Sequence, residues 1–199
     1  MKYFKMLGLL AVAAAALMAF AGTASATITY NGSAYTGTIE ATSSNSELDG
    51  TVDVKCAKST VAGNLSNGAT TWGFDTLTFT ECGSDTVSVI GNHFFIGPVT
   101  VIDPIGNLRI DSDGTVYVEG AEVTVQVHRS VFGFPVTTHC IYRTAANPGT
   151  DVGDLIEGST FIALSGANIP QVSTDGGCGS NAQWTGFYKI TKPGALTVD

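Results

Sequence analysis

Hydrophobic and polar residues alternate along most of the chain, most clearly between residues 107 and 129. Every second residue from Val123 to Val127 is a valine, and this period of two is typical of a half-buried antiparallel strand. Asp113-Gly114 predicts a two-residue type I′ turn, because both central positions of that turn need positive φ. A second, weaker break lies at Gly120. We therefore expect three short strands joined by two tight turns at the centre of the fold.

The same alternation predicts a set of short strands separated by Gly, Asn, Asp and Ser, a spacing typical of two packed antiparallel sheets or a barrel. No window after the first residues keeps an apolar helical face for three turns without Gly or Pro. The predicted fold class is all-β, an antiparallel β-sandwich or barrel. The other expected strands are residues 28–30, 35–41, 51–56, 59–65, 76–82, 86–90, 94–102, 137–143, 151–157, 160–164, 184–191 and 196–198, with loops at 43–49, 71–75, 131–136 and 173–181.

The first 26 residues have the three parts of a secretory signal peptide. Lys2 and Lys5 form a basic start, residues 7–20 are apolar, and Ala24-Ser25-Ala26 is a small-residue cleavage site. We expect a signal peptide at residues 1–26 and a single all-β domain at residues 27–199, with no membrane anchor in the mature chain. The expected location is outside the cytoplasm, secreted or in the cell envelope.

Charge narrows the classes of partner. Residues 27–199 keep all 17 acidic side chains and lose two of the nine basic ones, which gives a formal charge of −10. An acidic chain without a basic stripe repels phosphate backbones, so we expect no nucleic acid as a partner, and anionic membrane surfaces are disfavoured for the same reason. The partner class left open is an unknown extracellular ligand or protein.

Four cysteines lie after the signal peptide, an even number that predicts two disulfides in an exported chain. Of the three possible pairings we favour Cys56–Cys82 with Cys140–Cys178, because it places one bridge on each side of the central strands. Closing loops of these lengths stabilises a fold by roughly 3.5 and 4 kcal/mol in the chain-entropy model. The alternative, a metal site, lacks CxxC spacing and a histidine cluster.

The motifs of the common catalytic sites are absent: the chain has no GxSxG, no HExxH and no glycine-rich phosphate loop before a helix. His93, His128 and His139 are scattered, and a metal site made of all three would need long-range convergence. We expect no cofactor, no metal and no catalytic residue.

One stretch resembles the start of a calcium-binding loop. Asp111, Asp113 and Gly114 have its alternating carboxylates and its glycine, and Glu122 lies eleven positions beyond Asp111. However, the residues before Glu122 alternate as a strand, which would carry its carboxylate away. The sequence favours a plain hairpin turn.

Two apolar loops contain the candidate ligand-contact residues Trp72, Phe132 and Phe134. An exposed tryptophan can stack on a sugar ring or anchor a partner, and two phenylalanines around a glycine would make an apolar patch. The alternative is that Trp72 packs under a sheet edge and that the Phe132 loop folds over the end of the fold into the core, which the sequence favours. Trp184 and Tyr188 share one face of the last long strand and are expected in the core.

The cysteines and the C-terminal strand together resemble a loose set of small exported bacterial proteins of unassigned function. The shared features are a cysteine in an early strand, TFTEC at Cys82, CIY at Cys140, and a final WTGFY strand before Pro193. The resemblance implies an exported, disulfide-linked all-β fold and names no catalytic residue.

These observations predict a secreted, non-enzymatic binding or surface-associated β-sandwich protein. One alternative is a secreted hydrolase that uses carboxylates such as Asp111, Asp113 or Asp151. Another is an inhibitor of secreted proteases whose bait is a loop near Cys178.

Overall fold

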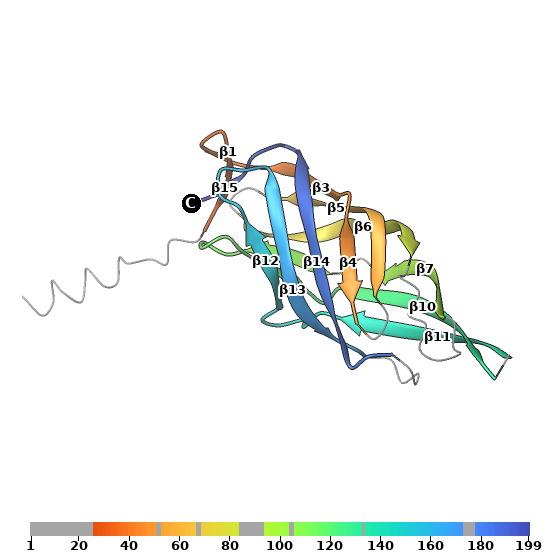
Figure 1. Cartoon of the computed structure of the whole chain (residues 1–199). Helices are drawn as coiled ribbons and strands as arrows, with labels where there is room; N and C mark the ends of the chain where they lie inside the picture. The colour runs from red at the N-terminus through yellow and green to blue at the C-terminus, as the bar shows by residue number, and fades with distance from the viewer. Residues whose placement is uncertain are drawn as a thin grey trace, which may run out of the picture.

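The computed structural model describes residues 26–50, 53–66, 69–83, 94–103, 106–132, 134–172 and 178–199. Within these ranges all regular structure consists of antiparallel β-strands (Figure 1), which confirms the predicted all-β class. The predicted signal peptide and the predicted strand at 86–90 lie outside the described residues, except that Ala26 is described.

The main sheet closes on itself as a barrel. Its strands follow the order β13-β12-β9-β8-β6-β5-β3-β14, and β13 also pairs with β14, so the ring has no free edge. β3 and β4 together fill one place in the ring, because both pair with β5 on one side and with β14 on the other. The bounds of these strands are β3 Gly37–Ser43, β4 Ser46–Asp49, β5 Val54–Leu65, β6 Thr71–Gly83, β8 Asn107–Ile110, β9 Thr115–Glu119, β12 Thr150–Leu155, β13 Phe161–Pro170 and β14 Asn181–Lys192.

A small sheet covers one end of the barrel (Figure 1). It consists of β15 (Thr197–Val198), β1 (Ile28–Tyr30) and β2 (Ser33–Ala34). The Thr27 and Asp199 backbones exchange two hydrogen bonds of 2.7 and 3.0 Å, so the two ends of the domain lie side by side. Ile28 and Leu196 are fully buried against the barrel core, which explains why this end is closed.

A second sheet projects from the other end. It consists of β7 (Phe94–Asp103), β10 (Glu122–Val131) and β11 (Phe134–Arg143), in the order β11-β10-β7. β10 and β11 pair along their whole length, from Glu122↔Arg143 to Val131↔Phe134. We call this hairpin, Glu122–Arg143, the arm. In Figure 1 the arm extends well beyond the barrel.

The barrel interior is organised around Trp184 and Tyr188, which are buried as predicted. Trp184 Nε1 donates a 3.0 Å hydrogen bond to Ser46 Oγ, and Tyr188 Oη donates one of 2.8 Å to Ser59 Oγ. The Ser46 and Tyr188 hydroxyls lie 3.1 Å apart, so the four groups form one network across β4, β5 and β14. A buried network of this kind fixes one arrangement of the strands, because any other would leave polar groups unpaired.

The central strands differ from the prediction at both of their turns. Four residues, 111–114, separate β8 from β9. Gly114 N donates a hydrogen bond to Asp111 O, and of the Asp113-Gly114 pair only Gly114 has positive φ (87°). The result is a longer turn ending in a left-handed glycine rather than a two-residue type I′ turn. At Gly120 the chain does not fold back, since β9 pairs with β8 and β12 while β10 pairs with β7 and β11.

Two predicted loops are strands in the structure. Residues 46–49 of the expected loop 43–49 form β4, and the expected loop 71–75 is the start of β6. Both stretches are rich in polar residues or glycine, but their backbone groups are paired by neighbours distant in sequence. The expected loop 131–136 is almost wholly strand, because the β10–β11 pairing runs up to Val131 and Phe134.

Both predicted disulfides are present, Cys56–Cys82 and Cys140–Cys178. Cys56 and Cys82 are directly opposed residues of β5 and β6, so this bridge links neighbouring barrel strands. The second bridge ties β11 of the arm to the segment before β14. Structural disulfides of this kind form and persist in an oxidising compartment.

Changing Gly63 to alanine should destabilise the barrel. The added Cβ would clash with the carbonyl oxygen of Gly73 and with Cδ1 of the Trp72 indole. Overpacking a filled interior costs typically about 1–3 kcal/mol in the free energy of unfolding, which urea unfolding with intact disulfides would measure. Gly73→Ala is the matched control: its Cβ would meet only Asn107 Oδ1 at 3.6 Å, so we expect little change. Equal stability of the two variants would contradict the packing of Trp72 beneath Gly63.

Burial raises the pKa of the Tyr188 hydroxyl above its usual value, and its hydrogen bonds with Ser46 and Ser59 offset this only in part. An unfolded tyrosine ionises near pH 10, so the stability linked to this group is complete below about pH 10 and is lost as the pH rises further. Burial also raises the pKa of Tyr142. Tyr188→Phe should lower the free energy of unfolding by about 0.5–1.5 kcal/mol at neutral pH and weaken its decline in alkaline solution. Urea unfolding between neutral pH and pH 11 would measure this. A parallel fall in the free energy of unfolding of both proteins would contradict the prediction.

Candidate functional site

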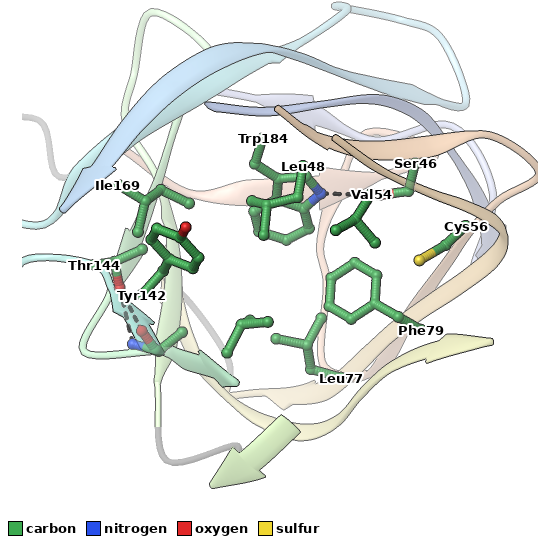
Figure 2. A pocket seen from close by; sticks show the side chains of 12 residues that line it. Ser46, Leu48, Val54, Cys56, Leu77, Phe79, Tyr142, Thr144, Ile169 and Trp184 are labelled. Atoms are coloured by element: carbon green, nitrogen blue, oxygen red, sulfur yellow. Dashed lines mark hydrogen bonds between the residues drawn. The ribbon is translucent and has the colours of Figure 1, made fainter. Parts of the chain in front are cut away.

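Two apolar cavities lie inside the barrel on either side of Trp184, which lines both. The larger, of about 30 Å³, lies between the barrel and the base of the arm, where Leu77, Phe79 and Tyr142 face it (Figure 2). The smaller measures about 20 Å³. Pockets for drug-sized ligands occupy roughly 300–1,000 Å³, so both cavities are gaps in a filled core. Neither of these two cavities has room for such a ligand.

The candidate residue Trp72 belongs to this core. Its side chain is 3% exposed and lines the smaller cavity, so it cannot reach a ligand at the surface. Among the described residues, its Nε1 and Thr124 Oγ1 are the buried side-chain polar atoms without a hydrogen-bond partner. An unpaired buried donor costs about 1–3 kcal/mol, which the burial of a large indole offsets. Trp72 therefore contributes to stability and not to recognition at the surface.

The other two candidates, Phe132 and Phe134, lie at the far end of the arm and are 96% and 72% exposed. We call residues 131–136, VFGFPV, the tip. The expectation that this segment folds back into the core is wrong, because the β10–β11 pairing carries it away from the barrel (Figure 1). Val131 pairs with Phe134, so Phe132 and Gly133 alone connect the two strands.

Phe132 has a strained backbone, with φ of 51°. A bulky residue with positive φ is uncommon, and the left-handed conformation costs a non-glycine residue on the order of 1–3 kcal/mol. The two-residue connection explains the strain, because the turns that match the twist of a hairpin need positive φ at their first central position. The side chain that bears this cost makes almost no contact with its own domain.

Hydrogen bonds join the two strands of the arm to each other at its base. Ala121 N donates to Thr144 Oγ1 at 2.8 Å, and Thr144 N donates to Ala121 O at 2.9 Å. Arg143 Nε donates to Glu122 Oε2 at 2.7 Å at the first pair of the hairpin. The Cys140–Cys178 disulfide and a 2.8 Å hydrogen bond from Val172 N to Ile141 O attach β11 to the segment between β13 and β14, while the tip lies far from the barrel.

A second exposed phenylalanine lies on the barrel wall. Phe187 of β14 is 66% exposed and borders a shallow hollow of about 240 Å³ that Asn45 and Glu47 also line. It lies opposite Ala163 of β13, in a regular part of the sheet. Unlike Phe132, Phe187 shows no positive φ. Variants of Phe187 therefore control for the loss of an exposed phenylalanine outside the tip.

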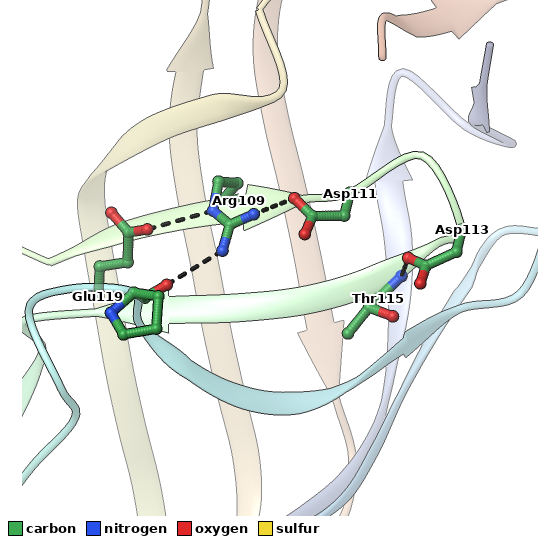
Figure 3. A network of polar contacts seen from close by, with 6 residues as sticks. Arg109, Asp111, Asp113, Thr115 and Glu119 are labelled. Atoms are coloured by element: carbon green, nitrogen blue, oxygen red, sulfur yellow. Dashed lines mark hydrogen bonds and ion pairs between the residues drawn. The ribbon is translucent and has the colours of Figure 1, made fainter. Parts of the chain in front are cut away.

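The carboxylates around the β8–β9 turn are engaged in structure (Figure 3). Arg109 pairs with Asp111, donates to Glu119 Oε1 at 3.2 Å and to Pro148 O at 3.0 Å, and lies 4.2 Å from the centre of the Tyr117 ring. The cation thus joins β8, β9 and the 145–149 loop. Asp111 therefore takes part in an ion pair that stabilises this hairpin.

Asp113 and Asp151, the other carboxylates named for a hydrolase, both accept hydrogen bonds from nearby backbone N–H groups. A backbone hydrogen bond from Thr115 lowers the pKa of Asp113, the opposite of what a general acid needs. Asp151 Oδ1 accepts a 3.2 Å hydrogen bond from Gly153 N. The sequence did not single out Asp49, whose pKa is raised by burial and then by a hydrogen bond with Glu47. Glu47 in turn pairs with Lys55 at 3.2 Å, which makes this group an ion-pair cluster on β4 and β5.

No metal site emerges from the part of the chain that the structure describes, where no three His, Cys, Asp or Glu side chains converge. His139 is exposed on β11, His128 lies on β10, and His93 is outside the described residues. Residues 173–177 of the predicted inhibitor loop near Cys178 also lie outside them. Within the described ranges no helix is long and apolar enough to cross a membrane.

The structure thus separates the candidates: Trp72 is in the core, whereas Phe132 and Phe134 lie together at an exposed tip. A comparison with known proteins adds no assignment, since no protein-family model, curated protein or solved structure matches the chain.

Proposed function

We propose that this is an exported, non-enzymatic binding protein that attaches to an apolar partner at the cell envelope through the tip of its arm. The observation that carries the proposal is the near-complete exposure of Phe132 and Phe134 at the end of a projecting hairpin. Export by a cleaved signal peptide is part of the proposal, and the two disulfides support it.

The energetics of the tip favour a binding role. Burying a phenylalanine side chain contributes about 1.5–3 kcal/mol, and neither Phe132 nor Phe134 gains this within its own domain. Phe132 also carries the cost of positive φ. A side chain that is strained and unburied contributes nothing to the fold, so a contact outside the domain is the physical reason to place it there.

The rest of the molecule suits a rigid carrier of this contact. The ring of strands is closed, its core is filled, and the Cys140–Cys178 disulfide ties the arm to the segment before β14. A binding group held on such a framework loses little conformational entropy when it binds. The carboxylates that a hydrolase would need are paired or exposed singly, as Asp111 and Asp113 illustrate.

Replacing Phe132 with asparagine should leave the domain at least as stable as the wild type. Asparagine tolerates the left-handed conformation far better than phenylalanine, and the exposed ring gives up no packing. We expect the free energy of unfolding to rise by up to about 1 kcal/mol, measured by urea unfolding. A loss of stability would mean that the phenylalanine ring packs against the domain.

The double variant Phe132→Asn/Phe134→Ser should lose attachment to cell envelopes isolated from the producing organism. Removal of two aromatic anchors is expected to weaken binding by at least about tenfold, since loss of a buried anchor costs upwards of 1–2 kcal/mol. Co-sedimentation of the purified, disulfide-intact proteins with the envelopes would measure this.

Phe187→Ser is the matched control, because it removes an exposed phenylalanine of the same chain from the barrel wall. It should co-sediment as the wild type does. Equal retention of all three proteins would show that the arm is not the attachment site, and no retention of the wild type would overturn the proposed function.

A further inference from the structure

Charge is unevenly distributed over the chain. From residue 123 to residue 150 there is no aspartate or glutamate, whereas the whole chain has 17. The same stretch contains Arg129, Arg143 and two histidines, and Arg143 is paired with Glu122 at the base. The sequence of the arm, Glu122 to Arg143, therefore carries a small positive charge although the chain as a whole is acidic.

Distance separates the tip from the nearest acidic residues of its own strands. In the β10–β11 ladder Glu122 lies nine residues from Val131, and in β7 Asp103 pairs with Glu122 at the same end. At about 3.3 Å per residue this is about 30 Å, several times the Debye length of about 10 Å at 0.1 M salt. Arg129, paired with Val136, is the charged residue of the arm closest to the tip in register.

The backbone at the tip is suited to the interfacial zone of a bilayer. Strand pairing continues to Val131 and Phe134, so the inward-facing backbone groups of the hairpin are paired as far as its turn. β11 is an edge strand, and its outward-facing groups need water, which the interfacial zone supplies and the hydrocarbon core does not. The register also places Phe94 opposite Arg129 and Phe95 opposite His128, so further aromatic residues lie at this end of the sheet.

The shape of the tip favours a fluid partner. It is a narrow, convex end bearing apolar side chains, with no hydroxyl or charged residue from Val131 to Val136 to specify a polar contact. The interfacial zone of a bilayer accepts apolar groups to a depth of about 5–10 Å without a preformed complementary pocket. Nearby basic residues add attraction to anionic head groups of about 1 kcal/mol each.

We propose that the tip inserts into the interfacial region of a lipid bilayer that carries anionic head groups, with Phe132 and Phe134 as the inserted side chains. This inference rests on the proposed function and names the partner class of the same site. The occupant it excludes is an apolar cleft on another protein, which the experiment below distinguishes.

The test is flotation of the purified, disulfide-intact protein with protein-free vesicles of phosphatidylcholine alone or mixed with phosphatidylglycerol. The wild type should float with both and more strongly with the mixture. Phe132→Asn/Phe134→Ser should lower the partition coefficient by about 100-fold, because each buried phenylalanine accounts for a tenfold step or more. Phe187→Ser should float like the wild type.

Reversing the charge of Arg129 tests whether anionic head groups attract the arm. Arg129→Glu should reduce partition into the mixed vesicles by about 30-fold, since it changes the charge near the surface by two units. It should have a smaller effect on phosphatidylcholine alone. An equal effect on both lipids would overturn the role of anionic head groups.

Insertion itself can be followed by fluorescence, because the native Trp72 and Trp184 are buried. A Phe132→Trp variant should shift its emission to the blue on vesicles and be quenched by brominated lipid, whereas Phe187→Trp on the barrel wall should do neither. An unshifted Phe132→Trp would overturn insertion. If the wild type binds envelopes through the tip but does not float with vesicles, the binding function stands and the lipid inference fails. If it binds neither, both fail.

Discussion

The structure depends on the closure of β14 against β3 and β4, and on the side chains that fill the ring at this point. A barrel of eight strand positions has an interior only wide enough for its own side chains. Trp184 and Tyr188 occupy that space and bind Ser46 and Ser59 across the closure. These hydrogen bonds join the last long strand to the first ones, so the closed ring and the filled core depend on the same contacts.

Because side chains fill the barrel, the binding surface that we propose lies outside it, on the arm. The chain leaves the ring at Gly120, forms the arm, and returns at Thr144, where the hydrogen bonds with Ala121 close the excursion. Because the ring is complete without these residues, they could form an independent hairpin that reaches beyond the barrel (Figure 1). The arm base also covers the open end of the ring, with Tyr142 facing the cavity beside Trp184 (Figure 2).

The barrel and the tip of the arm differ in how much they contribute to stability. Packing, two disulfides and the Arg109 contacts stabilise the barrel and its surface hairpin (Figure 3). Against this stable background the fold tolerates a strained, exposed Phe132, whose local cost is small beside the whole. Local violations of the rules that govern the rest of a fold are expected at functional sites. The tip is such a violation, and this supports the proposal that the protein binds its partner there.

Much of the fold followed from the sequence alone. The period of two is a local property of each strand, so the all-β class and most strand positions could be predicted, including 94–102 and the core residues Trp184 and Tyr188. The disulfide pairing, predicted because it places one bridge on each side of the central strands, was also correct. Where pairing partners are distant, as for β4, local composition predicted a loop in place of a strand.

The site could be predicted only in part. Residues 72–74 and 132–134 share one pattern, an aromatic residue, a glycine and a phenylalanine, and the sequence made both candidates for recognition. Trp72 lies in a strand that belongs to the closed ring, where Gly63 leaves room for its indole. Phe132 connects two strands that leave the ring. The same three-residue pattern therefore lies within a strand in one place and at a turn in the other. Which of these it forms, and whether its aromatic side chain meets the core, depends on strand pairing over long distances, and this only the tertiary structure decided.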